Sequence, residues 1–254
     1  MRILALHSHP DDIEILAGGT VALLARAGHH VTMATMTCGD CGSREYGPEE
    51  LSAIRREEAR RAASLIGAEY VALGFKDLAI FNDDASRRRV TAAIRNARPD
   101  IVLTAAPVDY HCDHEATSSL VRDACFGVSA PNYDCSAYSD AAALDAIPHL
   151  YFMDSAASQD RDGRVIRPDF VVDVRAVFAL KREMLECHES QRAWLRRQHG
   201  MADYIETMEE WTRRRGALAG IEFGEGFRQY KGHPYPETPL LQELLGSAVS
   251  TARV

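Results

Sequence analysis

The sequence lacks several features that would point to particular classes of protein. It has no run of 18 or more apolar residues, so we expect no segment that spans a membrane. It has no excess of basic residues, since its net charge is -8. Nucleic acids and anionic membranes both require a basic surface, so we expect neither as a partner. The acidic net charge favours a small-molecule substrate instead. No basic and apolar leader precedes the first strand-like residues, which predicts a cytoplasmic protein.

Cysteine is sparse and dispersed, with six residues in a chain of 254 whose hydrophobic content is 46%. A chain of this size buries enough apolar surface to fold without disulfides, so we expect reduced thiols. Cys38 and Cys41 have the spacing of a metal or redox motif. No second such pair exists, which leaves this interpretation a minor alternative.

Strand-like and helix-like segments alternate along the chain, which predicts an α/β fold. We expect a Rossmann-like, mostly parallel sheet flanked by helices, with the active site at the C-terminal edge of the strands. One domain over 1–254 is expected, with a core over about 1–195 and a helical and extended tail over about 196–254. The expected strands are 3–6, 31–37, 70–75, 100–105, 149–153 and 170–174. The expected helices are 13–28, 49–67, 86–97, 115–126, 175–197, 202–215 and 239–245.

Five potential metal ligands or proton carriers follow the first expected strand within eight residues: His7, His9, Asp11, Asp12 and Glu14. One interpretation is a polar turn in which an aspartate caps the next helix. The other is a functional site. Local composition alone does not separate the two interpretations.

A second cluster follows the fourth expected strand, where His111 and His114 lie three positions apart. Such a pair alone is weak support for a site, because most loop histidines are solvated. The carboxyl ends of parallel strands meet at one edge, however, so this pair should approach the first cluster. Two histidines, a carboxylate and an open position make up a catalytic zinc site. Iron, cobalt or nickel would also accept these ligands.

These motifs resemble the LmbE/PIG-L superfamily of zinc-dependent N-deacetylases. The similarity extends to a Thr-x-Gly-x-x-Gly-Ser loop, an Arg-x-x-Glu-Ala helix, a Gly-x-x-Asp loop and a late His-x-Ser-Gln segment. The matching stretches are 9–12, 37–43, 54–59, 65–67, 74–77, 111–114 and 181–191.

The resemblance implies a role for six residues. His9, Asp12 and His114 would bind the metal. Asp11 would accept a proton from the attacking water as general base. His111 would stabilise the oxyanion, as an imidazolium, and Asp113 would orient His111 or a metal ligand.

The expected reaction is removal of an N-acetyl or related acyl group from an amino sugar or sugar-containing metabolite. A non-sugar amide is the alternative substrate, and a homo-oligomer is expected from the resemblance. A Rossmann-type nucleotide-binding protein is disfavoured because no Gly-x-Gly-x-x-Gly follows the first strand. A non-catalytic metal protein is disfavoured because a structural site needs no base beside it. The candidate substrate contacts are Arg55, Arg56, Asp77, Tyr110 and Glu14. A solvated helix face explains the arginines equally well, and a loop cap explains Asp77.

Overall fold

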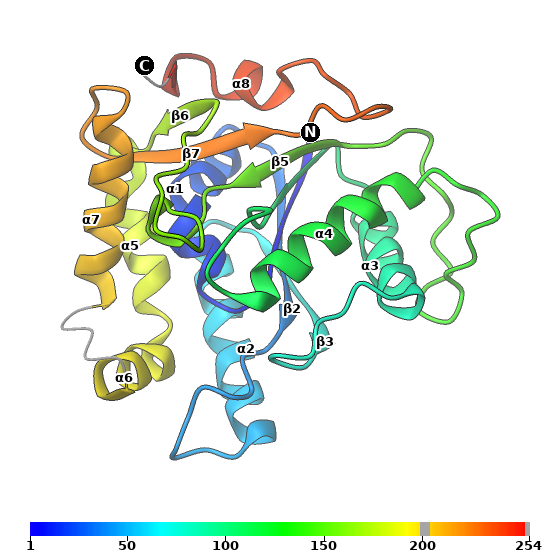
Figure 1. The fold of residues 1–254 in the computed structure, drawn as a ribbon, viewed down its shortest axis with the longest axis horizontal. Helices are drawn as coiled ribbons and strands as arrows, with labels where there is room; N and C mark the ends of the chain where they lie inside the picture. Colours follow the sequence, from blue (N-terminus) through cyan, green and yellow to red (C-terminus); the bar gives the residue numbers. More distant parts are fainter. Residues whose placement is uncertain (199–203, 252–254) are drawn as a thin grey trace.

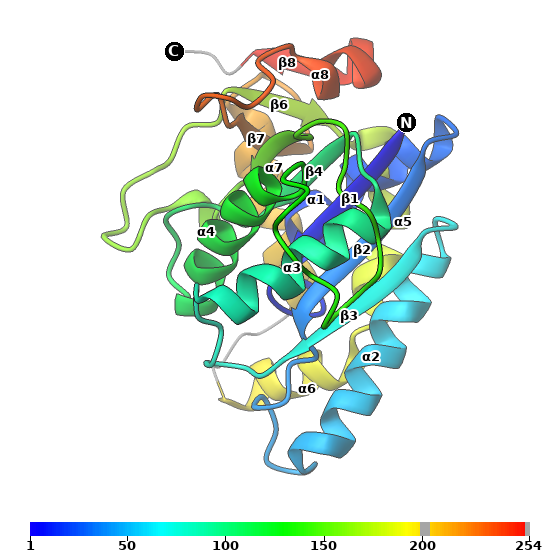
Figure 2. The same ribbon diagram turned by 90° about the vertical axis from the view of Figure 1, so that its right-hand side faces the viewer.

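The computed structural model describes residues 1–198 and 204–251, and it contains one eight-stranded sheet with helices on both faces (Figures 1 and 2). The strand order is β3-β2-β1-β4-β5-β7-β6-β8. The predicted α/β architecture is confirmed. The strands are β1 (Arg2–His7), β2 (His30–Thr37), β3 (Glu69–Phe75), β4 (Ile101–Thr104), β5 (His149–Met153), β6 (Phe170–Asp173), β7 (Gly224–Gln229) and β8 (Val249–Thr251).

The first five strands of this order are parallel, and β1 lies at their centre between β2 and β4. Ile3, Leu4, Ala5 and Leu6 are all buried. A parallel strand covered on both faces needs such a continuous apolar run. The expected convergence of the loops at one edge of the sheet follows from this parallel pairing.

Two helical layers cover the sheet, with α3 and α4 on one face and α1 and α5 on the other (Figure 1). Each layer packs on its own apolar cluster of sheet residues, so the core lies on both faces of the sheet. The helices are α1 (Asp12–Arg26), α2 (Pro48–Ser64), α3 (Asp84–Ala97), α4 (Cys112–Gly127), α5 (Phe178–Glu186), α6 (Glu189–Gln198), α7 (Tyr204–Ala217) and α8 (Leu240–Leu245). None of the helices in the described ranges is long and apolar enough to cross a membrane.

Residues beyond 195 contribute to the sheet as well as to its surface. Strand β7 lies between β5 and β6 and is antiparallel to both. Within this strand Glu225 accepts hydrogen bonds from the backbone of Gly19 and Thr20 and pairs with Lys181 at 2.6 Å. Buried ion pairs need several partners of this kind. Strand β7 is thereby tied to α1 and α5.

The prediction of one long helix over 175–197 is wrong. The chain forms a short 3₁₀ turn over Arg175–Val177, then α5, a break at Cys187 and His188, and α6. At the break His188 turns inward to Glu14, with 3.0 Å between Nε2 and Oε1. Glu58 accepts hydrogen bonds from the backbone N–H and the hydroxyl of Ser190. The first bond satisfies a backbone N–H in the first turn of α6, where helices leave such donors without a partner of their own. Tertiary contacts therefore outweigh the helical periodicity. The predicted helix over 202–215 is α7, and its first two predicted residues lie outside the described residues.

Candidate active site

The turn between β1 and α1 holds its backbone in an unusual conformation. Asp11 is the residue before α1 and has φ 98° and ψ -27°, in the left-handed region that residues other than glycine rarely occupy. Its carboxylate makes no capping hydrogen bond to the helix. The helix-cap interpretation therefore fails for Asp11. Strained backbone conformations of this kind are concentrated at functional sites. Here the strained residue, Asp11, lines a cavity.

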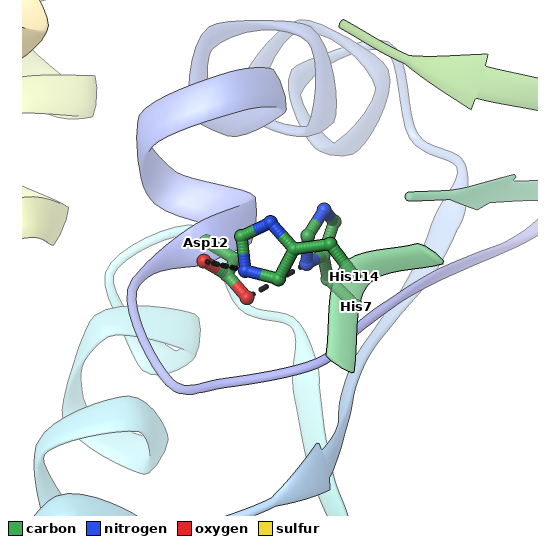
Figure 3. Close-up of side chains that lie close together, drawn as sticks. All are labelled: His7, Asp12 and His114. Atoms are coloured by element: carbon green, nitrogen blue, oxygen red, sulfur yellow. Dashed lines mark hydrogen bonds and ion pairs between the residues drawn. The ribbon is translucent and has the colours of Figure 1, made fainter. Parts of the chain in front are cut away.

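Asp12 is the centre of the histidine cluster (Figure 3). Its Oδ2 lies 2.7 Å from His7 Nδ1 and 3.3 Å from His9 Nδ1, and it accepts a hydrogen bond from the His9 backbone N–H at 2.8 Å. Its Oδ1 lies 3.4 Å from His114 Nε2. Residues separated by a hundred positions thus meet around one carboxylate, as the parallel topology predicts.

His9 and His114 each direct their second ring nitrogen toward another carboxylate. His9 Nε2 is 3.2 Å from Asp113 Oδ2, and His114 Nδ1 is 3.3 Å from Asp109 Oδ1. Metal-binding histidines are usually oriented in this way by a carboxylate on the far side of the ring. Asp113 contacts the expected ligand His9 through its side chain, and its backbone N–H contacts His111.

The carboxylates around His9 and His114 favour positive charge at this cluster. Burial opposes charge on His9 and His114, but contacts with Asp113 and Asp12 raise the pKa of His9 to about 9. Contacts with Asp12 and Asp109 raise the pKa of His114 to about 10. Although burial acts in the opposite direction, His114 and His7 hold the pKa of Asp12 well below its usual value. A divalent cation would supply that positive charge in place of protons.

Asp12 and the histidines around it are suitable ligands for a metal ion. Two pairs of histidines could complete the site with Asp12: His7 with His114, or His9 with His114. His7, Asp12 and His114 form a compact buried group. His9, Asp12 and His114 all line the cavity, whereas His7 is fully buried and does not. Within the second set, His9 Nδ1 lies 3.3 Å from Oδ2 of Asp12 and His114 Nε2 lies 3.4 Å from Oδ1, so the two rings approach the two oxygens of one carboxylate. A metal held by the second set would be open to a substrate in the cavity.

Two residues that line the cavity, Tyr204 and Arg55, contact the carboxylate of Asp11. Tyr204 of α7 donates its hydroxyl to Asp11 Oδ2 at 2.5 Å, and Arg55 Nη2 lies 3.6 Å from the same oxygen. Burial raises the pKa of Asp11 to about 6 while Arg55 opposes this shift. A carboxylate with such a pKa accepts a proton readily near neutral pH.

His111 accepts a hydrogen bond at Nδ1 from the backbone N–H of Asp113 at 3.1 Å. The nitrogen left to donate is Nε2. Burial and the nearby His9 and His114 lower the pKa of His111. These shifts favour a neutral ring over the imidazolium expected from the sequence, and the neutral ring still donates from Nε2.

The candidate substrate contacts divide into two groups. Arg55, Asp77 and Tyr110 line the cavity. Arg56 and Glu14 do not: Arg56 contacts Cys38 Sγ at 3.6 Å, and Glu14 is buried against His188. Cys112 contacts Asp113 and is not part of the cavity wall. All six cysteines are free, as expected.

Sequence reasoning missed several residues of the site. Sequence motifs assign no role to His7 or to Asp109, which lies two positions before His111. Tyr204 and the cavity residues Trp194 and Trp211 lie on α6 and α7, outside any recognised motif. Tryptophan on a helix otherwise rich in Glu and Arg was the available signal.

Comparison with known proteins places this chain among relatives. The family model PIG-L, described as GlcNAc-PI de-N-acetylase, matches residues 4–125. The uncharacterized deacetylase YaiS of Escherichia coli K12 is 30% identical over 133 residues, which cover 48% of this chain and 67% of YaiS. The chain belongs to the PIG-L family.

Two further comparisons each cover 91% of this chain. The diacetylchitobiose deacetylase of Thermococcus kodakarensis is 28% identical over 246 residues, covering 91% of this chain and 84% of that enzyme. Among solved structures, the 4-carboxy-2-hydroxymuconate hydratase GalB of Pseudomonas putida KT2440 has a TM-score of 0.75 at 23% identity. The superposition covers 91% of this chain and 97% of the hydratase. The shared fold alone therefore does not decide the reaction.

Proposed function

We propose that this protein is a metal-dependent N-deacetylase that hydrolyses the N-acetyl group of an amino sugar. The observation that supports this most is the meeting, in one cavity of about 700 Å³, of a metal-compatible trio with a separate carboxylate and a separate imidazole. Metal-assisted amide hydrolysis uses a metal, a general base and a group that stabilises the oxyanion. The diacetylchitobiose deacetylase relative supports an amino sugar as the substrate class.

His9, Asp12 and His114 would hold the metal, and His7 would fix Oδ2 of Asp12 from behind. When bound, zinc supplies a Lewis acid for the amide carbonyl and lowers the pKa of a water to about 7. Asp113 and Asp109 would keep the rings of His9 and His114 oriented.

The other two groups move protons and stabilise charge. Asp11 accepts the proton of the attacking water, with Tyr204 and Arg55 fixing the orientation of its carboxylate. His111 donates from Nε2 to the oxygen that becomes negative in the tetrahedral intermediate. The proton held by Asp11 then passes to the departing nitrogen, which leaves as a free amine with acetate as the other product.

A panel of amides tests this proposal. Zinc-loaded protein is incubated with N-acetylglucosamine, diacetylchitobiose and a simple non-sugar amide such as N-acetylbutylamine, and primary amine is measured. Release from the sugars, and none from an Asp11→Asn variant with the same zinc content, is the expected result. Amine release from the non-sugar amide alone would show that the substrate is a non-sugar amide and not an amino sugar. No amine release from any of the amides would contradict the proposed function. The cytoplasmic location and the homo-oligomer stay predictions.

A further inference from the structure

One wall of the active-site cavity is mostly apolar and is built by α1, α6 and α7, which also contribute the uncharged polar side chains of Gln191, Thr207 and Tyr204. In the described parts of α6 and α7, no residue that lines the cavity carries a charge, although both helices are rich in Glu and Arg. The helices thus present one selected face to the cavity. The apolar residues of the wall are Ile15, Leu16, Trp194, Leu195, Met208 and Trp211.

The face of α7 that forms this wall continues directly to the proposed base. Tyr204, Met208 and Trp211 follow one another at intervals of four and three residues, which places them along one side of the helix. Tyr204 ends this row with its hydroxyl on Asp11. The apolar wall and the reacting centre therefore share one cavity and one supporting helix.

Helix α7 is anchored near both ends of this row. At one end Tyr204 is buried and bonded to Asp11, and at the other Arg215 pairs with Asp154 and donates to the Ile166 carbonyl at 3.0 Å. Ile205 and Met208 pack into a buried cluster with Leu185 of α5. A surface fixed in this way binds a ligand without first having to be ordered.

The two sides of the cavity suit different parts of a ligand. Asp11, Asp77 and the histidines can hydrogen-bond to sugar hydroxyls and the amide. The aliphatic side chains of Leu195, Met208 and Ile15 cannot, so a hydroxyl placed against them would lose its water without gaining a partner. Aromatic and aliphatic walls bury alkyl and aryl groups favourably. The cavity, at about 700 Å³, lies within the range of about 300–1,000 Å³ that accommodates ligands with several such parts.

We infer that this wall is a subsite for an alkyl or aryl group carried by the N-acyl amino sugar. The inference rests on the proposed function for the identity of the sugar. The apolar group would come either from a longer N-acyl chain or from an aglycone on the anomeric oxygen. The wall belongs largely to helices outside residues 4–125, which the family model matches.

Intrinsic fluorescence gives a direct binding measurement, because both tryptophans of the chain line this cavity. Zinc-loaded Asp11→Asn protein is titrated with two ligand series. The first lengthens the acyl group of methyl N-acylglucosaminide from acetyl to butyryl to hexanoyl. The second keeps the acetyl group and changes the aglycone from methyl to hexyl or phenyl. We expect the affinity for the ligand to rise in one of the two series, by about fourfold per buried methylene, which is equivalent to ~0.8 kcal/mol. A rise in the first series shows that the apolar group is part of the acyl chain, and a rise in the second shows that it is part of the aglycone.

Substitutions in the wall test its contribution to selectivity. Trp211→Ala should reduce the preference for the apolar ligand over the methyl glycoside by about tenfold, and Leu195→Gln, on the other helix, should reduce it in the same direction. Phe126→Ala removes an aromatic ring that is 57% exposed on α4 and should leave the preference unchanged. Circular dichroism of each variant confirms folding.

The outcomes separate the inference from the proposed function. Equal affinities along both series, or an unchanged preference in both wall variants, would overturn the subsite. Tighter binding of the apolar ligands without amine release by the wild-type enzyme would leave the subsite intact and refute the deacetylase.

Discussion

The hydroxyl of Tyr204 lies 2.5 Å from Oδ2 of Asp11, although 193 positions separate the two residues. Asp11 belongs to the strained turn after β1, and Tyr204 is the first residue of α7. This contact joins the proposed general base to the helix that supports the apolar wall. Orientation of the base therefore depends on a segment outside the matched family region.

Tyr204→Phe should lower kcat by about 10- to 100-fold, because a hydrogen bond to a charged group contributes about 1.5–3 kcal/mol. KM should change by no more than about threefold, since Asp11 would be misoriented rather than removed. Tyr138→Phe is the matched control, because Tyr138 is 44% exposed and does not line the cavity. A wild-type kcat in Tyr204→Phe would show that the contact is only structural.

Asp11→Ala and His111→Ala should each lower turnover by about 10²-fold or more while zinc remains bound. Neither residue belongs to the proposed ligand trio, so one zinc per chain should persist. Steady-state rates and elemental analysis of the same preparation check both statements. Full activity in either variant with stoichiometric zinc would refute the corresponding role.

Metal content distinguishes the two histidine pairs around Asp12. His9→Ala and His114→Ala should each abolish stoichiometric zinc binding, because one of three ligands is lost. His7→Ala should retain zinc with an affinity about 10- to 100-fold weaker, as expected for a residue behind a ligand. Zinc per chain after gel filtration, and recovery of activity when a chelator-treated sample receives zinc, provide the measurement. Zinc loss in His7→Ala with retention in His9→Ala would reverse the assignment.

The buried pair of His188 and Glu14 predicts a pH-dependent stability. Burial opposes the charge on His188, but Glu14 outweighs it and raises the His188 pKa above 6.5. The folded state therefore retains a proton that the unfolded state releases. The stabilisation is complete below pH 6.5 and is lost as the pH rises through the raised pKa.

Glu14→Gln should remove this contribution. Its free energy of unfolding should fall below that of wild type by about 2 kcal/mol at pH 6, and the difference should shrink as the pH rises. Urea unfolding of metal-free proteins between pH 6 and 9 measures it. Glu57→Gln, which changes an exposed carboxylate on α2, is the control. A difference that does not vary with pH would contradict the assignment.

The sequence alone determined the α/β class, the parallel strands and the two clusters that meet at their edge. Buried strands need continuous apolar runs, and parallel pairing brings their carboxyl ends together, so local composition carries this information. The motifs around His9 and His114 are short and continuous in the sequence, so the sequence alone indicated the family. The two motifs lie in the segments that follow β1 and β4.

Only the tertiary structure decided how those residues are supported. It placed His7 behind Asp12, turned His188 inward to break a long predicted helix, and moved Glu14 away from the cavity. It also brought Tyr204 and Trp211 beside the reacting centre. Except for His7 with Asp12, these contacts join residues far apart in the chain. Which side of a helix meets which neighbour depends on packing that periodicity does not encode.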